Sequence, residues 1–546
     1  MTVTALILLM INLSTAQLTQ RAYVNGKIYT VNPLQPQAEV VVTQGNTIIY
    51  VGSRETAGAL LEESRIIDLQ GKLMLPGFID NHTHFIGGGF YLLGIDLRPA
   101  KSTADFKRIL KNYVKTRPGE WITGGNWDHE QWETKDLPSK EMIDDYSADT
   151  PILVSRFDGH MSLANSYALK LAGITRDTPS PSGGLIVKDK KTGEPTGVLK
   201  DEAAYLVSRL IPDSTPEQIE QAARRALQEA KENGITSLHD ITYQSHLEIY
   251  QKLEREGDLT CRIYTRLPIS EYKDLVDSGI RAGFGSDRLK VGALKGFADG
   301  SLGSSTALFF EPYTQDPTTS GLAMGIVTDG RLKKWALDAD KNKLQMSIHA
   351  IGDKANAQIL DMFAEIIDQN PVWDRRFRME HAQHIRFEDI PRFAQLGVIA
   401  SVQPYHAIDD GVWAEKRIGD RIRYTYPFRS FLDAGVKLCF GSDWDVAPLN
   451  VLWGIYAAVT RRTLDGKNPD GWIPEQKITV EEAIRCYTIN NAYAAFEENT
   501  KGSIEVGKIA DFVVLNQDIL TIDPVKIFDT KAIMTVLNGE IIYQGK

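Results

Sequence analysis

The chain has 546 residues, of which 42% are hydrophobic and 24% charged, and its formal net charge is -10 at pH 7. Single cores stop growing at roughly 250–300 residues, so this length indicates a large barrel with additions, or several domains. The negative charge, without any basic cluster, argues against a nucleic-acid partner. The three cysteines show no C-x-x-C spacing, which argues against a disulfide framework and a thiolate zinc site.

The N-terminus carries a short apolar segment, residues 5–11, followed by the small residues Ser14-Thr15-Ala16. We interpret residues 1–17 as a signal peptide, although the first basic residue is Arg21. A wrongly assigned start or a buried first strand are the alternatives. With a signal peptide the protein is secreted or periplasmic; without one it is cytoplasmic. No run of 18 apolar residues occurs, so we expect no membrane-spanning helix.

Short strand patterns occupy both ends of the chain. One hairpin pattern turns at Asn25-Gly26 and another at Asn538-Gly539. Chain termini commonly lie close together in space. We therefore expect residues 20–72 and 502–546 to pair into one small composite β-sandwich domain.

Residues 73–501 alternate apolar strand patterns with helical stretches, which is typical of parallel βα units. The sequence therefore predicts an α/β protein with a (β/α)₈ TIM barrel. The eight expected barrel strands are residues 75–81, 151–157, 234–239, 289–297, 344–349, 377–381, 398–402 and 436–440. Two longer segments, about 88–150 and 171–211, are expected to be insertions over the barrel mouth.

Metal-binding residue types stand at the ends of several expected strands. His82-Thr83-His84 ends the first, and alternate residues of a strand point to the same side, so both histidines can reach one centre. His349, His381 and Asp443 stand at three further strand ends, which in a barrel face the active site. Each alone could be a hydrogen-bonded core histidine or a helix cap. Together they predict a site for zinc or a similar divalent ion.

These motifs resemble the amidohydrolase superfamily and, within it, the YtcJ-like metal-dependent hydrolases, which include N-substituted formamide deformylase. The resemblance runs from about residue 22 to the C-terminus. Besides the histidines above, it rests on residues 76–80, 158–160, 234–240, 299–304, 349–353, 442–443 and 502–511.

The resemblance implies two divalent metal ions, with zinc expected, bridged by a carboxylated lysine at Lys295. The ligand set is then His82, His84, Lys295, His349, His381 and Asp443. The chemistry is consistent, because an ammonium group cannot bind a cation, whereas a carbamate formed with CO₂ offers two anionic oxygens. Two alternatives stay open: Lys295 pairs with Asp299 and only one metal binds, or nearby Lys290 takes the bridging role.

The expected reaction is hydrolysis of the C–N bond of a linear amide, an N-acyl or N-formyl amine. Two metal ions lower the pKa of a water and polarise the carbonyl. Asp443 acts as general base and then as general acid toward the departing nitrogen. His384 either donates to the substrate oxygen or only supports the site. The alternatives are a cyclic amide hydrolase or a heterocycle deaminase on the same metal site, and a non-enzymatic descendant of the fold, which predicts lost ligands.

Four residues are candidates for substrate binding: His160, His239, Trp127 and Tyr405. The two histidines stand at expected strand ends, where hydrogen-bonded packing is the alternative. Trp127 belongs to an aromatic cluster of the first insertion, which forms either an apolar substrate wall or the small core of that insertion. The expected partner is a small-molecule amide; the oligomeric state stays open, and a homodimer is one assembly that the sequence allows.

Overall fold

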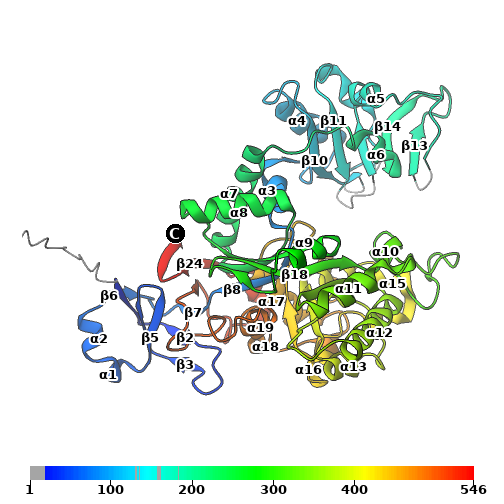
Figure 1. Ribbon diagram of the computed structural model, residues 1–546. Helices are drawn as coiled ribbons and strands as arrows, with labels where there is room; N and C mark the ends of the chain where they lie inside the picture. Colours follow the sequence, from blue (N-terminus) through cyan, green and yellow to red (C-terminus); the bar gives the residue numbers. More distant parts are fainter. Residues whose placement is uncertain (1–18, 130–131, 135, 157–160, 182–183, 546) are drawn as a thin grey trace, which may run out of the picture.

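The computed structural model describes residues 19–129, 132–134, 136–156, 161–181 and 184–545. The expected signal segment lies outside these residues. Among the residues described, no helix is both long enough and apolar enough to cross a membrane. Figure 1 shows a large central body, a smaller one that contains both described ends of the chain, and a third that stands apart from the rest.

The central body is a parallel barrel. The hydrogen-bonded strand order is β8-β15-β16-β18-β19-β20-β21-β22. These strands are β8 (Phe78–Thr83), β15 (Ile235–Ile241), β16 (Arg262–Pro268), β18 (Leu289–Phe297), β19 (Gln345–Ala350), β20 (Arg378–His381), β21 (Ile399–Val402) and β22 (Leu438–Phe440). The last strand returns to the first just beyond its end, where the Asp443 amide donates to the His82 carbonyl at 2.7 Å. The predicted (β/α)₈ fold class is confirmed.

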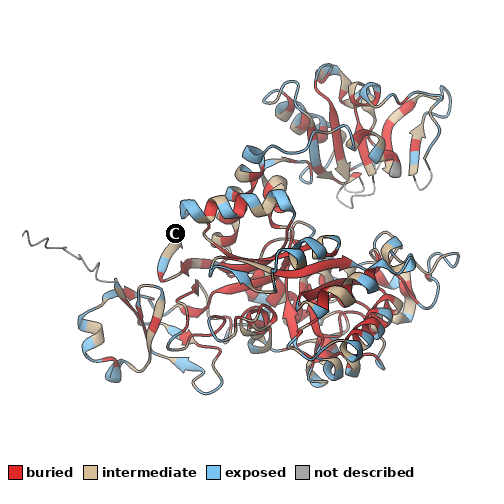
Figure 2. Cartoon of the chain, in the orientation of Figure 1, coloured by how far each residue is buried: buried red, intermediate tan, exposed pale blue. Residues whose placement is uncertain are grey.

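Helices surround the barrel and turn their apolar faces toward it. In α7 (Pro216–Glu232), Thr215 and Gln218 form a reciprocal capping box, and proline stands at the first turn, where its missing N–H costs nothing. Other helices of the layer are α8 (Gln244–Glu256), α11 (Arg331–Lys341), α12 (Asp353–Gln369), α13 (Ile390–Leu396), α16 (Phe428–Asp433) and α17 (Val451–Thr460). Figure 2 shows that the buried residues concentrate in the barrel strands and on the inward sides of these helices.

One predicted barrel strand was wrong. Residues 151–157 lie partly in β11 (Ile152–Arg156), which pairs with neighbours outside the barrel. The missing barrel strand is β16, which bonds to β15 and β18. Its sequence, RIYTRLP, mixes polar and apolar residues and carries two arginines, so it does not show the continuous apolar run of a strand buried on both faces. Both arginines are nevertheless buried, because Arg262 pairs with Asp511 and Arg266 with Glu380.

The two expected insertions are one insertion between the first two barrel strands, with its own sheet. The sheet order is β13-β14-β12-β11-β10-β9. These strands are β9 (Ile95–Asp96), β10 (Ile122–Trp127), β11, β12 (Met161–Ala164), β13 (Gly184–Lys188) and β14 (Pro195–Asp201). Because side chains alternate along a strand, Val154 of β11 enters one apolar cluster of the insertion and Leu153 the other. The insertion joins the barrel through α3 (Phe85–Leu93) and α7 (Figure 1).

Strands from both ends of the chain form two further sheets. One has the order β5-β4-β1-β6 and the other β25-β24-β23-β7-β2-β3. The strands are β1 (Gln20–Val24), β2 (Lys27–Tyr29), β3 (Gln37–Ala38), β4 (Val40–Gln44), β5 (Thr47–Gly52), β6 (Arg65–Asp68), β7 (Leu73–Pro76), β23 (Phe512–Leu515), β24 (Ala532–Leu537) and β25 (Glu540–Gln544). The sheets share one apolar core, in which the rings of Tyr23 and Phe512 meet edge to face at 5.3 Å. The predicted small β-sandwich is present.

Candidate metal centre

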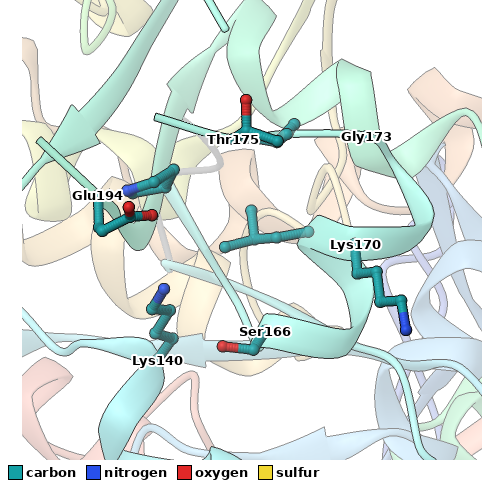
Figure 3. A pocket seen from close by; sticks show the side chains of 9 residues that line it. Lys140, Ser166, Lys170, Gly173, Thr175 and Glu194 are labelled. Atoms are coloured by element: carbon teal, nitrogen blue, oxygen red, sulfur yellow. The ribbon is translucent and has the colours of Figure 1, made fainter. Parts of the chain in front are cut away.

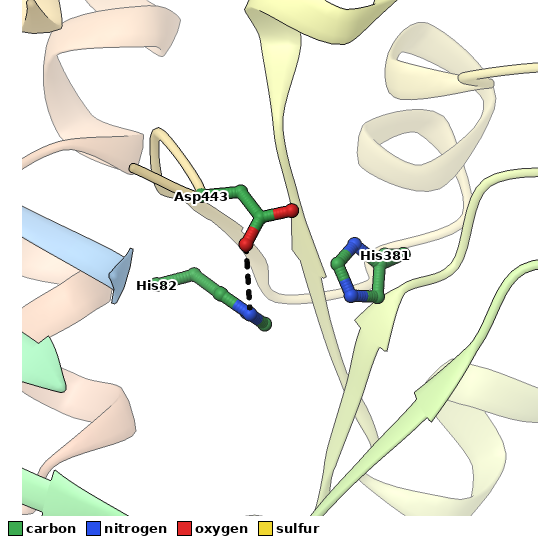
Figure 4. A group of neighbouring side chains, drawn as sticks. All are labelled: His82, His381 and Asp443. Carbon is green, nitrogen blue, oxygen red and sulfur yellow. Dashed lines mark ion pairs between the residues drawn. The ribbon is translucent and has the colours of Figure 1, made fainter. Parts of the chain in front are cut away.

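Three of the expected ligands meet at the ends of barrel strands. His82 of β8, His381 of β20 and Asp443 after β22 each offer an atom within 4.8 Å of the others. All three residues are buried. Figure 4 shows the two imidazole rings on either side of the Asp443 carboxylate. This set, two nitrogens and one carboxylate oxygen, suits zinc and its first-row neighbours.

The orientation of His82 is fixed by Glu380. His82 Nδ1 donates to Glu380 Oε2 at 2.5 Å, so the other ring nitrogen, Nε2, is turned toward Asp443, 3.4 Å from its Oδ1 atom. Burial and the charges of Arg266 and Lys295 hold the pKa of His82 well below its usual range. The imidazole is therefore neutral, which is the form that binds metals.

Glu380 is itself held by a buried polar network. Burial alone would raise the pKa of this carboxyl, but Arg378, Arg266 and His82 hold it well below its usual range. Besides His82, its contacts are Arg266 Nη1 at 3.0 Å, Arg378 Nε at 2.8 Å, Ser347 Oγ at 2.7 Å and Ser401 Oγ at 2.6 Å. A fully buried, ionised carboxylate with this many donors is a rigid support for His82.

The centre fits a cation because its inward-facing polar atoms are otherwise unsatisfied. His82 Nε2, Asp443 Oδ1 and Lys295 Nζ are buried and have no hydrogen-bond partner among the described residues. Burial would raise the pKa of Asp443, but His82, His84 and His381 hold it well below its usual range, so the carboxylate is ionised. Unsatisfied buried polar groups are rare in folded proteins, and a bound ion is one of the explanations for them.

Lys295 stands in β18 in the interior of the barrel. Burial, together with Arg266 and Arg378, lowers the pKa of its amine to about 7 against the opposing charges of Glu380 and Asp443. Asp299 does not pair with it: its carboxylate accepts the amides of Leu308, Ile351 and Gly352. Lys290 instead forms an ion pair with Glu497 at 2.7 Å. Of the two lysines considered, Lys295 is therefore the one near the cluster.

The other two expected histidine ligands border the same space. His84 Nε2 lies 3.5 Å from Asp443 Oδ1, and its side chain is one-third exposed. The ring of His349 lies 4.4 Å from the ring of His381, centroid to centroid. His349 Nε2 donates to the Gly300 carbonyl at 3.1 Å, so Nδ1 is the nitrogen left for a ligand. His381 Nδ1 donates to Gln403 Oε1 at 2.8 Å, so Nε2 is the nitrogen left there.

The backbone at this centre is unusual. His381 has φ of 71° and Asp443 has φ of 60°, a left-handed region that costs of order 1–3 kcal/mol for residues other than glycine. At Gly441, a Cβ atom would lie 2.5 Å from the His82 amide nitrogen. The chain thus accepts strain and close backbone contact where these side chains converge, as is common at functional sites.

His384 has partners elsewhere. Its Nδ1 atom lies 2.7 Å from the Thr425 hydroxyl, and its Nε2 atom 3.2 Å from Gln383 Nε2. Burial and Arg421 lower its pKa to about 3. A role for this ring toward substrate stays a prediction; its observed contacts are with the protein.

The predicted substrate-binding residues are dispersed. Trp127 is fully buried in the insertion and donates to the Val154 carbonyl at 2.9 Å, which agrees with the core interpretation rather than the substrate wall. His239 is also fully buried, 2.9 Å from Arg378 Nη1. Tyr405, half-buried, stacks on Trp453 with 6.2 Å between centroids. His160 lies outside the described residues.

Two cavities are associated with the insertion. One, of about 230 Å³, is lined by insertion residues that include Lys140, Ser166 and Glu194 (Figure 3) and by none of the expected ligands. The other, of about 690 Å³, lies between α3, β10 and the segment before α7, and it reaches Asp445. The larger cavity thus reaches a residue two positions after Asp443 in the chain, and it has the size of a small-molecule site.

The residues that support the centre were not predicted from the sequence. Glu380 and Arg378 precede His381 in β20. The signal in the sequence was that two charged residues stand within a strand that was expected to be buried. Arg266 gave none, because its strand was not recognised. His406, whose Nε2 lies 4.0 Å from Asp443 Oδ2, follows the seventh predicted strand beside Tyr405.

Neutral histidines and an ionised aspartate lie together at the carboxyl ends of the barrel strands. This arrangement is typical of metal-dependent hydrolases. The chain belongs to the amidohydrolase family: the model of that family matches residues 65–543.

Known relatives agree with this assignment. The chain is 37% identical over 508 residues to Protein LONG AFTER FAR-RED 3 of Arabidopsis thaliana, covering 90% of this chain and 86% of the relative. It is 32% identical to the putative amidohydrolase YtcJ of Bacillus subtilis, covering 95% and 98%. It is 26% identical to the N-substituted formamide deformylase of Arthrobacter pascens, covering 97% and 99%.

Solved structures share the architecture. An uncharacterized metal-dependent hydrolase from Pyrococcus horikoshii OT3 matches with a TM-score of 0.79 and 29% identity, over 93% of this chain and 99% of that one. The atrazine chlorohydrolase TrzN from Arthrobacter aurescens TC1, solved with zinc, matches with a TM-score of 0.53 over 96% and 95% of the two chains. At 15% identity, the second likeness shows the fold alone.

Proposed function

We propose that the protein hydrolyses the C–N bond of linear amides, N-acyl or N-formyl amines, at a two-metal centre. The observation that carries the proposal is the buried cluster at the strand ends, where His82 Nε2, Asp443 Oδ1 and Lys295 Nζ have no hydrogen-bond partner among the described residues. The formamide deformylase relative, similar over nearly the full length of both chains, supports an amide substrate.

The residues that would hold the ions are His82, His84, His349, His381, Asp443 and Lys295 as a carbamate. Carbamate formation needs a neutral amine, because its nitrogen lone pair attacks CO₂ and a proton is then lost. The low pKa of buried Lys295 favours that neutral form. When bound, the ions supply a water of lowered pKa and polarise the substrate carbonyl.

Asp443 performs the proton transfers of the proposed reaction. Its ionised carboxylate takes a proton as the water oxygen attacks the carbonyl carbon. Asp443 then gives the proton to the departing nitrogen; the C–N electron pair stays on that nitrogen, and the carbonyl of the carboxylic acid forms again. Its position at a strand end of the barrel supports this role.

The experiment measures metal content per chain and amide hydrolysis for the wild type, Lys295→Ala and Lys290→Ala. We expect about two metal ions in the wild type and in the Lys290 variant, whose side chain pairs with Glu497. The Lys295 variant should bind less metal, and it should no longer release amine from N-formyl and N-acyl alkylamines. One metal ion in all three proteins with activity intact would overturn the bridging role of Lys295. Ammonia release from heterocycles without linear amide hydrolysis would favour a deaminase instead.

A further inference from the structure

The two carboxylate oxygens of Asp443 face different partners. Oδ1 lies 3.4 Å from His82 Nε2 and 3.5 Å from His84 Nε2. Oδ2 faces His406, whose Nε2 atom is 4.0 Å away. The two oxygens of this carboxylate therefore have different neighbours.

His406 belongs to the first turn of α14 (Pro404–Asp410), which follows β21. Its Nε2 atom is buried and has no hydrogen-bond partner among the described residues. An imidazole nitrogen left in this state loses the hydrogen bond that it would make with water, which is unfavourable. A packed structural histidine would have this nitrogen satisfied, so the atom is available to a ligand at the centre.

The helix that carries His406 is fixed to the centre. Asp410 Oδ2, one helical turn beyond His406, accepts from Gln383 Nε2 at 2.8 Å and from the Tyr426 hydroxyl at 2.6 Å. Gln383 lies two residues after His381 in the chain. These bonds connect α14 to the end of β20, and they hold the His406 ring in place relative to Asp443.

The gap between Asp443 Oδ2 and His406 Nε2 fits one substrate atom. A separation of 4.0 Å is too long for a direct hydrogen bond. An atom placed off the line between them can be about 3 Å from both, which is hydrogen-bond distance. In the proposed reaction Asp443 must reach the departing nitrogen, and Oδ2 is its oxygen that lies closest to His406. The departing nitrogen is then also beside His406.

We propose that His406 Nε2 accepts a hydrogen bond from the N–H of the scissile amide, so that the protein selects secondary amides over N,N-disubstituted ones. This inference rests on the proposed function. A neutral imidazole with its proton on Nδ1 presents Nε2 as an acceptor. The bond turns the nitrogen lone pair, formed as the carbonyl carbon becomes tetrahedral, toward Asp443. Proton transfer from Asp443 Oδ2 to that lone pair breaks the C–N bond, and the amine leaves.

The test compares two substrates on four proteins. The substrates are N-phenethylformamide and N-methyl-N-phenethylformamide, which differ at the amide N–H. The proteins are the wild type, His406→Phe, which removes the acceptor but keeps a ring, His406→Gln, which keeps an acceptor, and Lys416→Ala, an exposed position of the next helix, α15 (Ala414–Ile418). The readout is the ratio of kcat/KM for the two formamides, which a folding defect alone does not change.

We expect the wild type and Lys416→Ala to prefer the secondary formamide by about 10-fold or more, in line with the cost of an unsatisfied buried acceptor. The preference should disappear in His406→Phe and return in part in His406→Gln. An unchanged preference in His406→Phe, with activity on both formamides, overturns the role of His406 and leaves the proposed function standing. Hydrolysis of neither formamide by the wild type contradicts the proposed function and this inference together.

Discussion

His82 Nδ1 lies 2.5 Å from Glu380 Oε2 in the interior of the barrel, and neither side chain has any exposed surface. The same carboxylate also accepts from two arginines and two serines, so its position is set by three barrel strands besides its own. A ligand histidine whose second nitrogen is held by a carboxylate has a fixed tautomer and orientation, and it is more basic toward a metal. The geometry of the centre therefore depends on a residue that does not itself reach the metal side.

Glu380→Gln tests that dependence. We expect metal affinity to fall about 10–100-fold, as is typical when the partner of a ligand histidine is changed, and the melting temperature to fall because Arg266 and Arg378 are left without their buried counter-charge. Metal content is measured after dialysis against increasing chelator. The matched control is Glu388→Gln, an exposed partner of Arg386, which should keep wild-type affinity. Equal metal retention by both variants would show that Glu380 does not orient His82.

His384 predicts a pH dependence of stability. Its folded-state pKa is about 3 because the ring is buried, whereas an exposed histidine titrates near about 6.5. The stability contributed by the neutral ring is fully present above pH ~6.5 and is lost as the pH falls toward 3, with a slope of at most ~1.4 kcal/mol per pH unit. The melting temperature should therefore fall less between pH 7.5 and pH 5 in His384→Asn than in the wild type.

The same variant separates the two roles considered for His384. If the ring only packs, kcat/KM of His384→Asn at pH 7.5 stays within a few-fold of the wild type. A loss of about 100-fold or more in kcat, with melting unchanged, would instead support a donor to the substrate oxygen, since general acid–base and donor groups contribute about that much. If the melting temperatures of His384→Asn and of the wild type fall equally between pH 7.5 and pH 5, this would contradict a buried neutral ring at His384.

The sequence predicted those parts of the molecule that follow from periodicity. His82 and His84, two residues apart at a strand end, could be expected at one centre because side chains alternate along a strand. β16 could not be recognised, because Arg262 and Arg266 indicate exposed positions in the sequence. In the structure both are buried, since Asp511 and Glu380, which are distant in sequence, neutralise their charges. The burial of that strand depends on ion pairs with distant residues, and the local sequence pattern does not indicate these pairs.

The same limit explains the insertion and the supporting groups. Residues 151–157 carry the apolar pattern of a strand buried on both faces, and β11 is indeed packed on both faces, but by the two cores of the insertion rather than by the barrel. The sheet to which a buried strand belongs depends on its pairing partners. Likewise, the position of His406 opposite Asp443 results from the parallel pairing of β21 with β22, after which these two residues follow.

Asp299 is expected to hold the loops that place His349. Its carboxylate accepts three backbone amides, from Leu308 at 2.8 Å, Ile351 at 3.0 Å and Gly352 at 2.8 Å. Asp299→Ala leaves these buried donors unsatisfied, at a cost of about 1–3 kcal/mol for each group that water does not reach. We expect a lower melting temperature and weaker retention of metal.

Asp329→Ala is the control for Asp299, because this exposed residue also accepts a backbone amide, from Arg331 at 3.0 Å. Its melting temperature should change little, since water can replace an exposed acceptor. Calorimetry and metal analysis of the two variants give the comparison. Wild-type melting in Asp299→Ala would show that the loops after β18 and β19 are fixed by other contacts.

Gly441 allows β22 to lie against the strand that carries His82. A methyl group there would stand 2.5 Å from the His82 amide nitrogen and 2.8 Å from its Cβ, and these atoms cannot move without shifting the ligand ring. Gly441→Ala should therefore lower both metal content and amide hydrolysis, while Gly325→Ala, where a Cβ meets no atom within 4 Å, should leave both unchanged. The expected destabilisation is about 1–3 kcal/mol, the usual cost of overpacking. If Gly441→Ala keeps its metal and its activity, the close approach of the first and last strands does not control the position of His82, and the centre must tolerate a shift of a few tenths of an ångström or more in one of its ligands.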